Sequence, residues 1–388
     1  MTVIRAGVLL LVLAGFSLAF SSLTANRIPV LVLPDTGLPA PQHEPVTSSE
    51  FISDDQTQEV HSATAVELPN GDIRVFWYGG TREGRENTEI YTRVLSEAQG
   101  SWSDIDKIIT RQQVASDTRR YIRKLGNPVA VASGNEIRLF FVTTSIGGWA
   151  TSSINLSVSA DNGKTWGEGS RLISSPLINI STLVRNPPLL TENGGLLLPV
   201  YHELAGKFSE LLQLDTSGSV INKFRISDGV QGMQPLLLPV DSTHAVALMR
   251  NGSDKQPRNI LFSRSMDNLS DWSALEDLSL PNPDAAVTAV QLDKPDELLL
   301  VFNNHPSERD DISMAWRQSD NAEWRVIHRF ETKQGDSNEH NPFSYPFLLK
   351  THDDNFHLFY TWKRKKIKHV YFNRAALQHM LSATGPSS

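Results

Sequence analysis

Polar side chains that can bind or transfer charge recur at one end of a series of short apolar segments in this 388-residue chain. Planar guanidinium groups in this set suit the bidentate binding of a carboxylate. Histidine, glutamate and tyrosine side chains can transfer protons to or from a reacting group. The set comprises His61, Arg82, Glu83, Glu86, Arg123, Asn127, Arg185, Asn186, His202, Glu203, Gln234, Arg250, His305, Arg309, Tyr345 and Trp362.

His61 has two interpretations that the sequence leaves open. It is either a hydrogen-bonded histidine in the interior of the fold or a proton carrier near neutral pH. No HExxH or similar ligand spacing occurs in the sequence, so we predict no required metal and no other cofactor.

Six segments position these residues, and all follow one two-strand pattern. Each is an apolar strand, a polar or glycine turn, and a second apolar strand that ends in large polar residues, as in HSATAVELPNGDIRVFWYGG. The segments begin at residues 61, 126, 185, 233, 283 and 345, which are 65, 59, 48, 50 and 62 residues apart. This spacing is typical of blades of four strands in a β-propeller.

A second hairpin lies between these segments, with a strand, a turn and a tryptophan. Its most complete copy is SADNGKTW, residues 159–166. Asp161 can accept hydrogen bonds from amides of its own turn, Gly163 can take a positive φ, and Trp166 can lie back across the hairpin. The motif therefore predicts a structural turn at a blade edge, remote from the axis.

The repeats predict an all-β fold, a six-bladed β-propeller over residues 48–374. The last unit supplies three strands, so we expect the segment around Glu50 to Ser53 to pair with it and close the ring. Residues 26–47 are rich in proline and predict an extended tether, and residues 375–388 predict a short helix and a tail.

The N-terminus predicts export to the periplasm or the extracellular face. Arg5 precedes an uncharged apolar run, which is typical of a signal peptide over residues 1–25. The stretch 6–23 is also nearly long enough to stay in the membrane as an anchor, and both outcomes remain open.

The 36 basic and 43 acidic residues give a net charge of −7, which argues against a nucleic-acid partner. Because cysteine is absent, disulfides and a thiolate nucleophile are excluded.

The pattern S-x-D-x-G-x-x-W in residues 159–166 resembles the Asp box of sialidases and other BNR-repeat propellers. The resemblance extends over nearly the whole chain after residue 50. It implies a glycosidase whose partner is an anionic glycan or polysaccharide. Sialidases bind the substrate carboxylate with three arginines. Their nucleophile is a tyrosine paired with a glutamate, and a separate aspartate acts as acid and base.

Carried over by position, the resemblance implies that Arg250 and Arg309 bind the carboxylate and that Tyr345 is the nucleophile. His61 stands where the family has its first arginine, and Gln234 stands where it has the glutamate. The carboxylates nearest to the position of the acid and base are Glu83 and Glu86. Glu203 is a candidate to replace the missing base. The remaining polar residues that we expect to bind substrate are Arg82, Arg123, Asn127, Asn186, His202, His305 and Trp362.

Two other functions remain open at this point. A uronate-directed polysaccharide lyase or an atypical glycosidase would use His61, His202 and Tyr345 for proton transfer. A non-catalytic propeller would only bind glycans. The basic run WKRKKIKH, residues 362–369, is either a solvated edge that discourages strand pairing or a contact for an anionic glycan.

Overall fold

The computed structural model describes residues 7, 28–34, 44–175, 179–227, 230–333, 340 and 342–383. Apart from Gly7, the predicted signal or anchor segment lies outside these residues. Among the described residues, none of the helices has the length and apolar character needed to cross a membrane.

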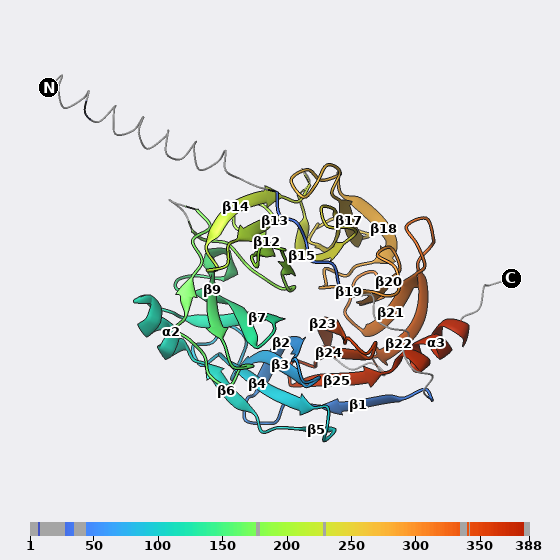
Figure 1. The fold of residues 1–388 in the computed structure, drawn as a ribbon, viewed down its shortest axis with the longest axis horizontal. Coiled ribbons are helices and arrows are strands. Elements are labelled where there is room, and N and C mark those ends of the chain that lie inside the picture. The colour runs from blue at the N-terminus through green and yellow to red at the C-terminus, as the bar shows by residue number, and fades with distance from the viewer. Residues whose placement is uncertain are drawn as a thin grey trace.

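Six antiparallel sheets surround a central axis (Figure 1). Two short α-helices, α2 (Arg111–Thr118) and α3 (Arg374–Ala383), lie outside the ring. From the innermost strand outward, blade one contains β2 (Glu59–Glu67), β3 (Ile73–Gly80), β4 (Glu89–Ser96) and β5 (Ser101–Trp102), with β6 (Asp106–Ile109) also paired with β4, and blade two contains β7 (Lys124–Ser133), β8 (Glu136–Thr144), β9 (Ser152–Ser159) and β10 (Ser170–Arg171). Blade three contains β11 (Leu189–Leu190), β12 (Leu196–His202), β13 (Phe208–Leu214) and β14 (Val220–Arg225), and blade four contains β15 (Gly232–Pro239), β16 (Ala245–Asn251), β17 (Asn259–Arg264) and β18 (Glu276–Pro281). Blade five contains β19 (Thr288–Gln291), β20 (Leu298–Phe302), β21 (Asp311–Arg317) and β22 (Arg325–Thr332), and blade six contains β23 (Phe343–Lys350), β24 (Phe356–Trp362), β25 (Lys366–Phe372) and β1 (Thr47–Phe51).

The first strand of the chain closes the ring. β1 pairs antiparallel with β25, and Glu50 lies opposite His369 in the register. The predicted six-bladed propeller and its closure by the segment near Glu50 are therefore confirmed. Hydrophobic clusters pack between each blade and the next, including one between blades six and one, so the apolar interior runs around the whole ring.

Four innermost strands carry a β-bulge near their start. The pairing register of β2, β7, β15 and β23 shifts there. Each bulge contains a non-glycine residue with positive φ: Ser62 at 56°, Asn127 at 24°, Gln234 at 52° and Tyr345 at 56°. Left-handed backbone is unfavourable for such residues and gathers at functional sites. The bulges break the strand alternation at the same end of four blades.

The SADNGKTW motif forms the turn that follows β9, toward the outside of blade two. Thr165 N donates to Asp161 Oδ1 at 2.9 Å, and Trp166 Nε1 donates to the carbonyl of Gly163 at 3.1 Å. Gly163 has a φ of +83°. The residues thus make the turn contacts that the sequence predicts, at the edge of the blade.

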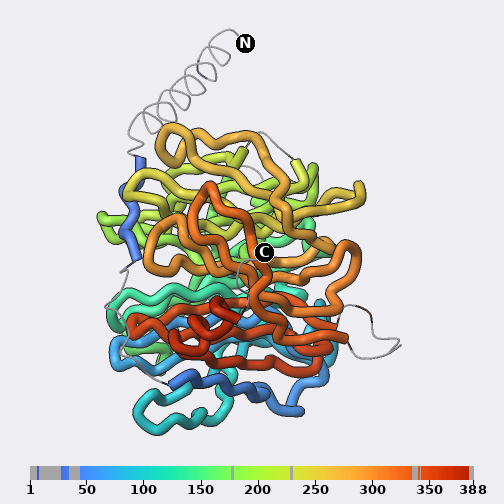
Figure 2. The backbone as a smooth tube through the Cα atoms, turned by 90° about the vertical axis from the view of Figure 1, so that its right-hand side faces the viewer, coloured from blue at the N-terminus to red at the C-terminus, as the bar shows by residue number. Residues whose placement is uncertain are grey.

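Part of the proline-rich segment lies against the propeller. Leu31 N donates to the carbonyl of Ser242 at 2.7 Å, and Val32 N donates to that of Leu190 at 2.9 Å. Leu31 is 1% exposed. Figure 2 shows residues 28–34, in blue, along one side of the molecule. This stretch contacts blades three and four.

Candidate functional site

Tyr345 is the point at which several blades meet. Gln234 Nε2 donates to Tyr345 Oη at 3.1 Å. The ring of His61 lies 4.2 Å from that of Tyr345, centroid to centroid, at an interplanar angle of 56°. All three residues lie at or beside the bulges of blades one, four and six. The structure therefore brings together three residues that the sequence nominates separately.

Arg185 lies against Tyr345, although the sequence assigns it no specific role. Its guanidinium carbon is 5.0 Å from the centroid of the Tyr345 ring, and Nη2 donates to the carbonyl of Pro346 at 2.8 Å. Its Nε and Nη1 form no hydrogen bond with any described residue. Burial lowers the pKa of Arg185 to about 10, against the opposing effect of Tyr345. The sequence marks the position of Arg185 at the start of a repeat, because Arg185 precedes an Asn-Pro pair as Gly126 does in the previous repeat.

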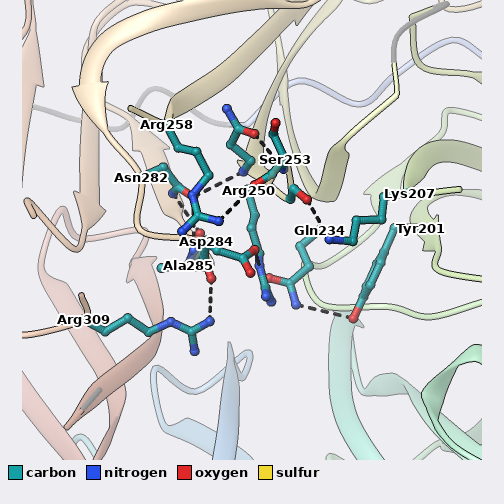
Figure 3. A network of polar contacts seen from close by, with 12 residues as sticks. Tyr201, Lys207, Gln234, Arg250, Ser253, Arg258, Asn282, Asp284, Ala285 and Arg309 are labelled. Carbon is teal, nitrogen blue, oxygen red and sulfur yellow. Dashed lines mark hydrogen bonds and ion pairs between the residues drawn. The ribbon is translucent and has the colours of Figure 1, made fainter. Parts of the chain in front are cut away.

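Arg250 and Arg309 share Asp284 (Figure 3). Both also interact electrostatically with Tyr345. Arg250 Nε lies 2.6 Å from Asp284 Oδ1, and Arg309 Nη2 donates to the backbone carbonyl of Asp284. Burial alone would lower the pKa of Arg250, but Tyr345 and Asp284 together raise it above its ordinary value. Burial and the neighbouring Arg250 lower the pKa of Arg309 to about 10. Both arginines therefore remain cationic near neutral pH.

Gln234 connects Tyr345 to a second buried phenol. Its Nε2 also lies 3.4 Å from Tyr201 Oη (Figure 3), and burial raises the pKa of Tyr201. Glu203 follows two residues later. Burial raises the pKa of Glu203, and the charges of Arg250 and Lys207 only partly offset this effect. Glu203 is thus a carboxyl group in the field of Arg250 that keeps its proton to higher pH than an ordinary glutamate.

Glu83 lies near His61, and the two residues line one small pocket together with Tyr78. It forms an ion pair with Arg364, and Tyr78 contributes a hydrogen bond. Burial lowers the pKa of His61 to about 3, so its ring is neutral near pH 7. Burial would raise the pKa of Glu83, but His61, Arg364 and Tyr78 lower it to about 2. Because His61 is neutral at pH 7, Arg364 is the cation that keeps Glu83 ionised there.

Arg364 belongs to the basic run of residues 362–369, which forms specific ion pairs rather than a free solvated edge. Lys366 Nζ lies 2.7 Å from Asp55 Oδ1, and Lys368 pairs with Glu331. Arg364 has a φ of 58° in the turn after β24. This left-handed turn precedes β25 and brings the guanidinium to Glu83.

A cleft of about 380 Å³ adjoins Glu83. Arg82 lies at this cleft and is exposed. Of the two carboxylates that the sequence nominates in this loop, only Glu83 is near His61. Glu86 is exposed, lines a different cleft of about 350 Å³ and contacts the hydroxyl of Tyr121 at 3.5 Å.

Four other predicted binding residues have partners away from Tyr345. His202 Nε2 lies 2.8 Å from Glu210 Oε2, because it follows Tyr201 on a strand and points to the other face. Arg123 is exposed and donates to Gly147. His305 Nδ1 accepts the backbone N–H of Glu308 at 2.9 Å. The Trp362 ring packs 5.1 Å from that of Phe51.

Two predicted asparagines join adjacent blades. Asn127 Nδ2 donates to the carbonyl of Val184 at 3.0 Å, next to Arg185. Asn186 Nδ2 donates to the carbonyl of Gln234 at 2.9 Å. Both side chains are buried. They hold the backbone that carries Arg185 and Gln234.

Within the described ranges, the side chains that could hold a metal ion together are Glu67, His352 and Asp353. Glu67 ends β2, and His352 follows β23, so this cluster lies at the opposite ends of the strands that begin near His61 and Tyr345. It is not part of the candidate site.

These blades and this arginine-rich axis define a propeller of the BNR class. Residues 71–358 match the family model of the BNR repeat-like domain, and the chain belongs to this family. No curated protein matches the sequence.

Solved structures with the same fold include sialidases. Trypanosoma rangeli sialidase aligns with a TM-score of 0.66 at 16% identity, over 88% of this chain and 62% of that one. The intramolecular trans-sialidase of Ruminococcus gnavus aligns with a TM-score of 0.64 at 12% identity, over 83% of this chain and 96% of that one. A protein of unknown function from Dyadobacter fermentans aligns with a TM-score of 0.65 at 13% identity, over 84% of this chain and 97% of that one. The chain spans 62% of the length of the Trypanosoma rangeli enzyme. At these low identities, the TM-scores show a common fold alone.

Proposed function

We propose that the chain is an exported glycoside hydrolase of the sialidase type that acts on a terminal anionic sugar. The observation that carries the proposal is that Arg185 packs against the Tyr345 ring and that Arg250 and Arg309 interact electrostatically with the same phenol. Three guanidinium groups around one phenol suit a substrate whose carboxylate is attached to the reacting carbon. A neutral phenol as nucleophile avoids repulsion from that carboxylate.

The proton transfers have different partners from those that the family resemblance implies. Gln234 donates to Tyr345 Oη and has no basic group that could take the phenolic proton. His61 is neutral near pH 7, lies against Tyr345, and forms no hydrogen bond from Nδ1 to a described residue. It is the candidate base. Its lowered pKa makes it a weak base in the free protein, and the charge of Glu83 is the effect that favours its protonated form. Glu203, with its raised pKa, is the candidate proton donor to the leaving oxygen.

The pair of His61 and Tyr345 also favours a second candidate, a uronate-directed lyase. The arginines would neutralise the uronate carboxylate, and His61 would take the C5 proton. The C5 electron pair would form the C4–C5 double bond as the C4–O bond breaks, and Tyr345 would protonate the leaving oxygen. This route does not need the glutamate that Gln234 replaces.

A product analysis separates the two candidates. The full chain is incubated with sialosides and with uronate oligosaccharides, and products are analysed by mass spectrometry and ultraviolet absorbance. We expect hydrolysis of a sialoside-type substrate with addition of water. An unsaturated, absorbing product would instead assign the lyase, and glycan binding without any product would contradict both enzymes.

Replacing Tyr345 tests the nucleophile. Tyr345→Phe keeps the ring and removes the hydroxyl, so we expect turnover to fall by roughly three orders of magnitude or more while substrate binding survives. Tyr121→Phe, at a tyrosine that is 59% exposed in the segment between α2 and β7, is the matched control and should keep full turnover. Near-normal turnover of Tyr345→Phe would remove this residue from the chemistry.

A further inference from the structure

The cleft beside Glu83 contains a buried lysine that the proposed chemistry does not use. Lys124 and Trp149 line this cleft, together with Glu59, Arg82, Glu83, Gly84 and Arg364. Lys124 is 7% exposed, and its Nζ lies 3.7 Å from the centroid of the Trp149 ring. Among the described residues, no carboxylate forms an ion pair with this ammonium group. Glu83 favours the charged lysine from a distance, but burial has the larger effect and lowers the pKa of Lys124. A buried charge without a direct ion pair is unfavourable, so its presence at a cleft points to a ligand.

The backbone around Lys124 is shaped to receive the indole. Gly126 lies in the bulge of β7, and a Cβ atom built there would lie 2.5 Å from Cη2 of Trp149. The close packing holds the ring over the Lys124 ammonium, where the ring face attracts a cation. Lys124 is therefore positioned at the cleft by a dedicated contact and not by a salt bridge.

The other charged side chains that line the cleft already have partners, so Lys124 and Arg82 are the cations that can bind an anion there. Glu83 is occupied by Arg364, and Glu59 Oε2 accepts the backbone N–H of Glu83 at 2.9 Å. Glu83 links the cleft to the candidate site, because it lines the cleft and interacts with Tyr78 and His61, and the His61 ring packs against that of Tyr345. The cleft therefore lies beside the residues that surround Tyr345.

We propose that the cleft between Lys124 and Arg82 binds an anionic substituent, a sulfate or a carboxylate, on the sugar next to the bond that is cleaved. This inference rests on the proposed function and narrows its substrate class to acidic glycans with negative charge on both sides of that bond. An anionic group there would receive a charge-assisted contact from Lys124.

Binding of simple sugars tests the inference without any turnover. Calorimetric titration of the full chain compares galactose 6-sulfate and galacturonate with uncharged galactose, in low and high salt. We expect the charged sugars to bind more tightly, with an affinity that falls as salt is added. Lys124→Met keeps the apolar stem on Trp149 and should lower the affinity for the charged sugars by about tenfold or more.

Three variants keep the result interpretable. Lys124→Arg should retain the preference for charged sugars, Lys164→Met on the exposed turn after β9 should bind as the wild type does, and Tyr345→Phe should bind normally. Equal affinity for galactose and galactose 6-sulfate, or unchanged affinity in Lys124→Met, overturns the inference. Because no product is measured, an inactive chain that still binds through Lys124 would contradict the proposed function alone.

Discussion

At the scale of single residues, Asp284 explains how Arg250 can be both buried and available to a ligand. The carboxylate contacts Arg250 at Nε, at 2.6 Å. This contact stabilises the charge of a side chain that is 14% exposed and fixes the plane of its guanidinium group. The backbone carbonyl of Asp284 holds Arg309 in the same way (Figure 3). One residue with a left-handed backbone, φ 56°, therefore orients two cations.

Removing either cation should affect charged substrates selectively. We expect Arg250→Ala or Arg309→Ala to cost on the order of 2 to 4 kcal/mol of transition-state stabilisation with an anionic substrate, because an oriented charge-assisted contact is lost. A neutral analogue should be nearly unaffected. The measurement is kcat/KM for both substrates, with Arg264→Ala, exposed at the end of β17, as the control. An equal loss for charged and neutral substrates would show that the arginines support the fold instead.

At the scale of strands, the period of two and its interruptions decide which residues reach the axis. Tyr201 and His202 are adjacent on β12, so they face opposite sides, and the buried tyrosine contacts Gln234 while the histidine contacts Glu210. This outcome could have been predicted from the alternation of β12. The contact between Gln234 and Tyr345 could not be predicted, because each lies in a bulge whose left-handed residue is not glycine.

The repeats were predictable for a related reason. Each blade repeats the same pattern of apolar strands and turn residues, and this local signal suffices for the number of blades. The Asn-Pro pair after Arg185 marks only its place at the start of a repeat. The role of Arg185 depends on contacts with Tyr345 and with Pro346, which is 161 residues and three blades away, and a local pattern does not encode these contacts. The choice of Glu83 over Glu86 likewise depends on Arg364 from the last blade.

The turn after β9 allows stability and activity to be separated. Asp161 accepts hydrogen bonds from Ser159 Oγ and from Thr165 N and Oγ1, and these hydrogen bonds lower its pKa. Asp161→Ala removes them, so we expect a lower midpoint of thermal unfolding and unchanged activity per folded molecule. Differential scanning calorimetry and an assay corrected for folded protein measure the two effects. A loss of activity without a loss of stability would place this turn in the function.

At the scale of the whole molecule, the ring is held shut by contacts between residues far apart in the sequence. β1 pairs with β25, and Trp102 Nε1 donates to Glu50 Oε1 at 2.7 Å, so blade one also contacts the closing strand. Beneath Glu50, His369 Nε2 lies 3.0 Å from His357 Nδ1, and the two buried rings stack. A hydrogen bond between two ring nitrogens needs one of them unprotonated, so protonation of both rings removes it.

The closed ring should therefore lose stability in mild acid. Burial lowers the pKa of His357 to about 3, with His369 adding to the effect, and burial also lowers the pKa of His369, although Glu50 opposes this. An unfolded histidine has a pKa near 6.5, so below that pH the unfolded chain binds more protons than the folded one. The contribution of His357 is fully present above pH 6.5 and is lost as the pH falls toward 3. At pH 5 it amounts to a loss of about 2 kcal/mol from His357 alone.

Urea unfolding at pH 7.5 and at pH 5 measures this loss, and His357→Phe tests its origin. Phenylalanine fills a similar volume and cannot be protonated, so the difference in unfolding free energy between the two pH values should shrink by about 2 kcal/mol, whatever the change in absolute stability. His379→Gln, exposed on α3, should leave the difference as in the wild type. The lowered pKa values of His61 and Glu83 add to the acid sensitivity in both proteins and cancel in the comparison. An unchanged pH difference in His357→Phe would show that the closure of the ring does not depend on a neutral histidine pair.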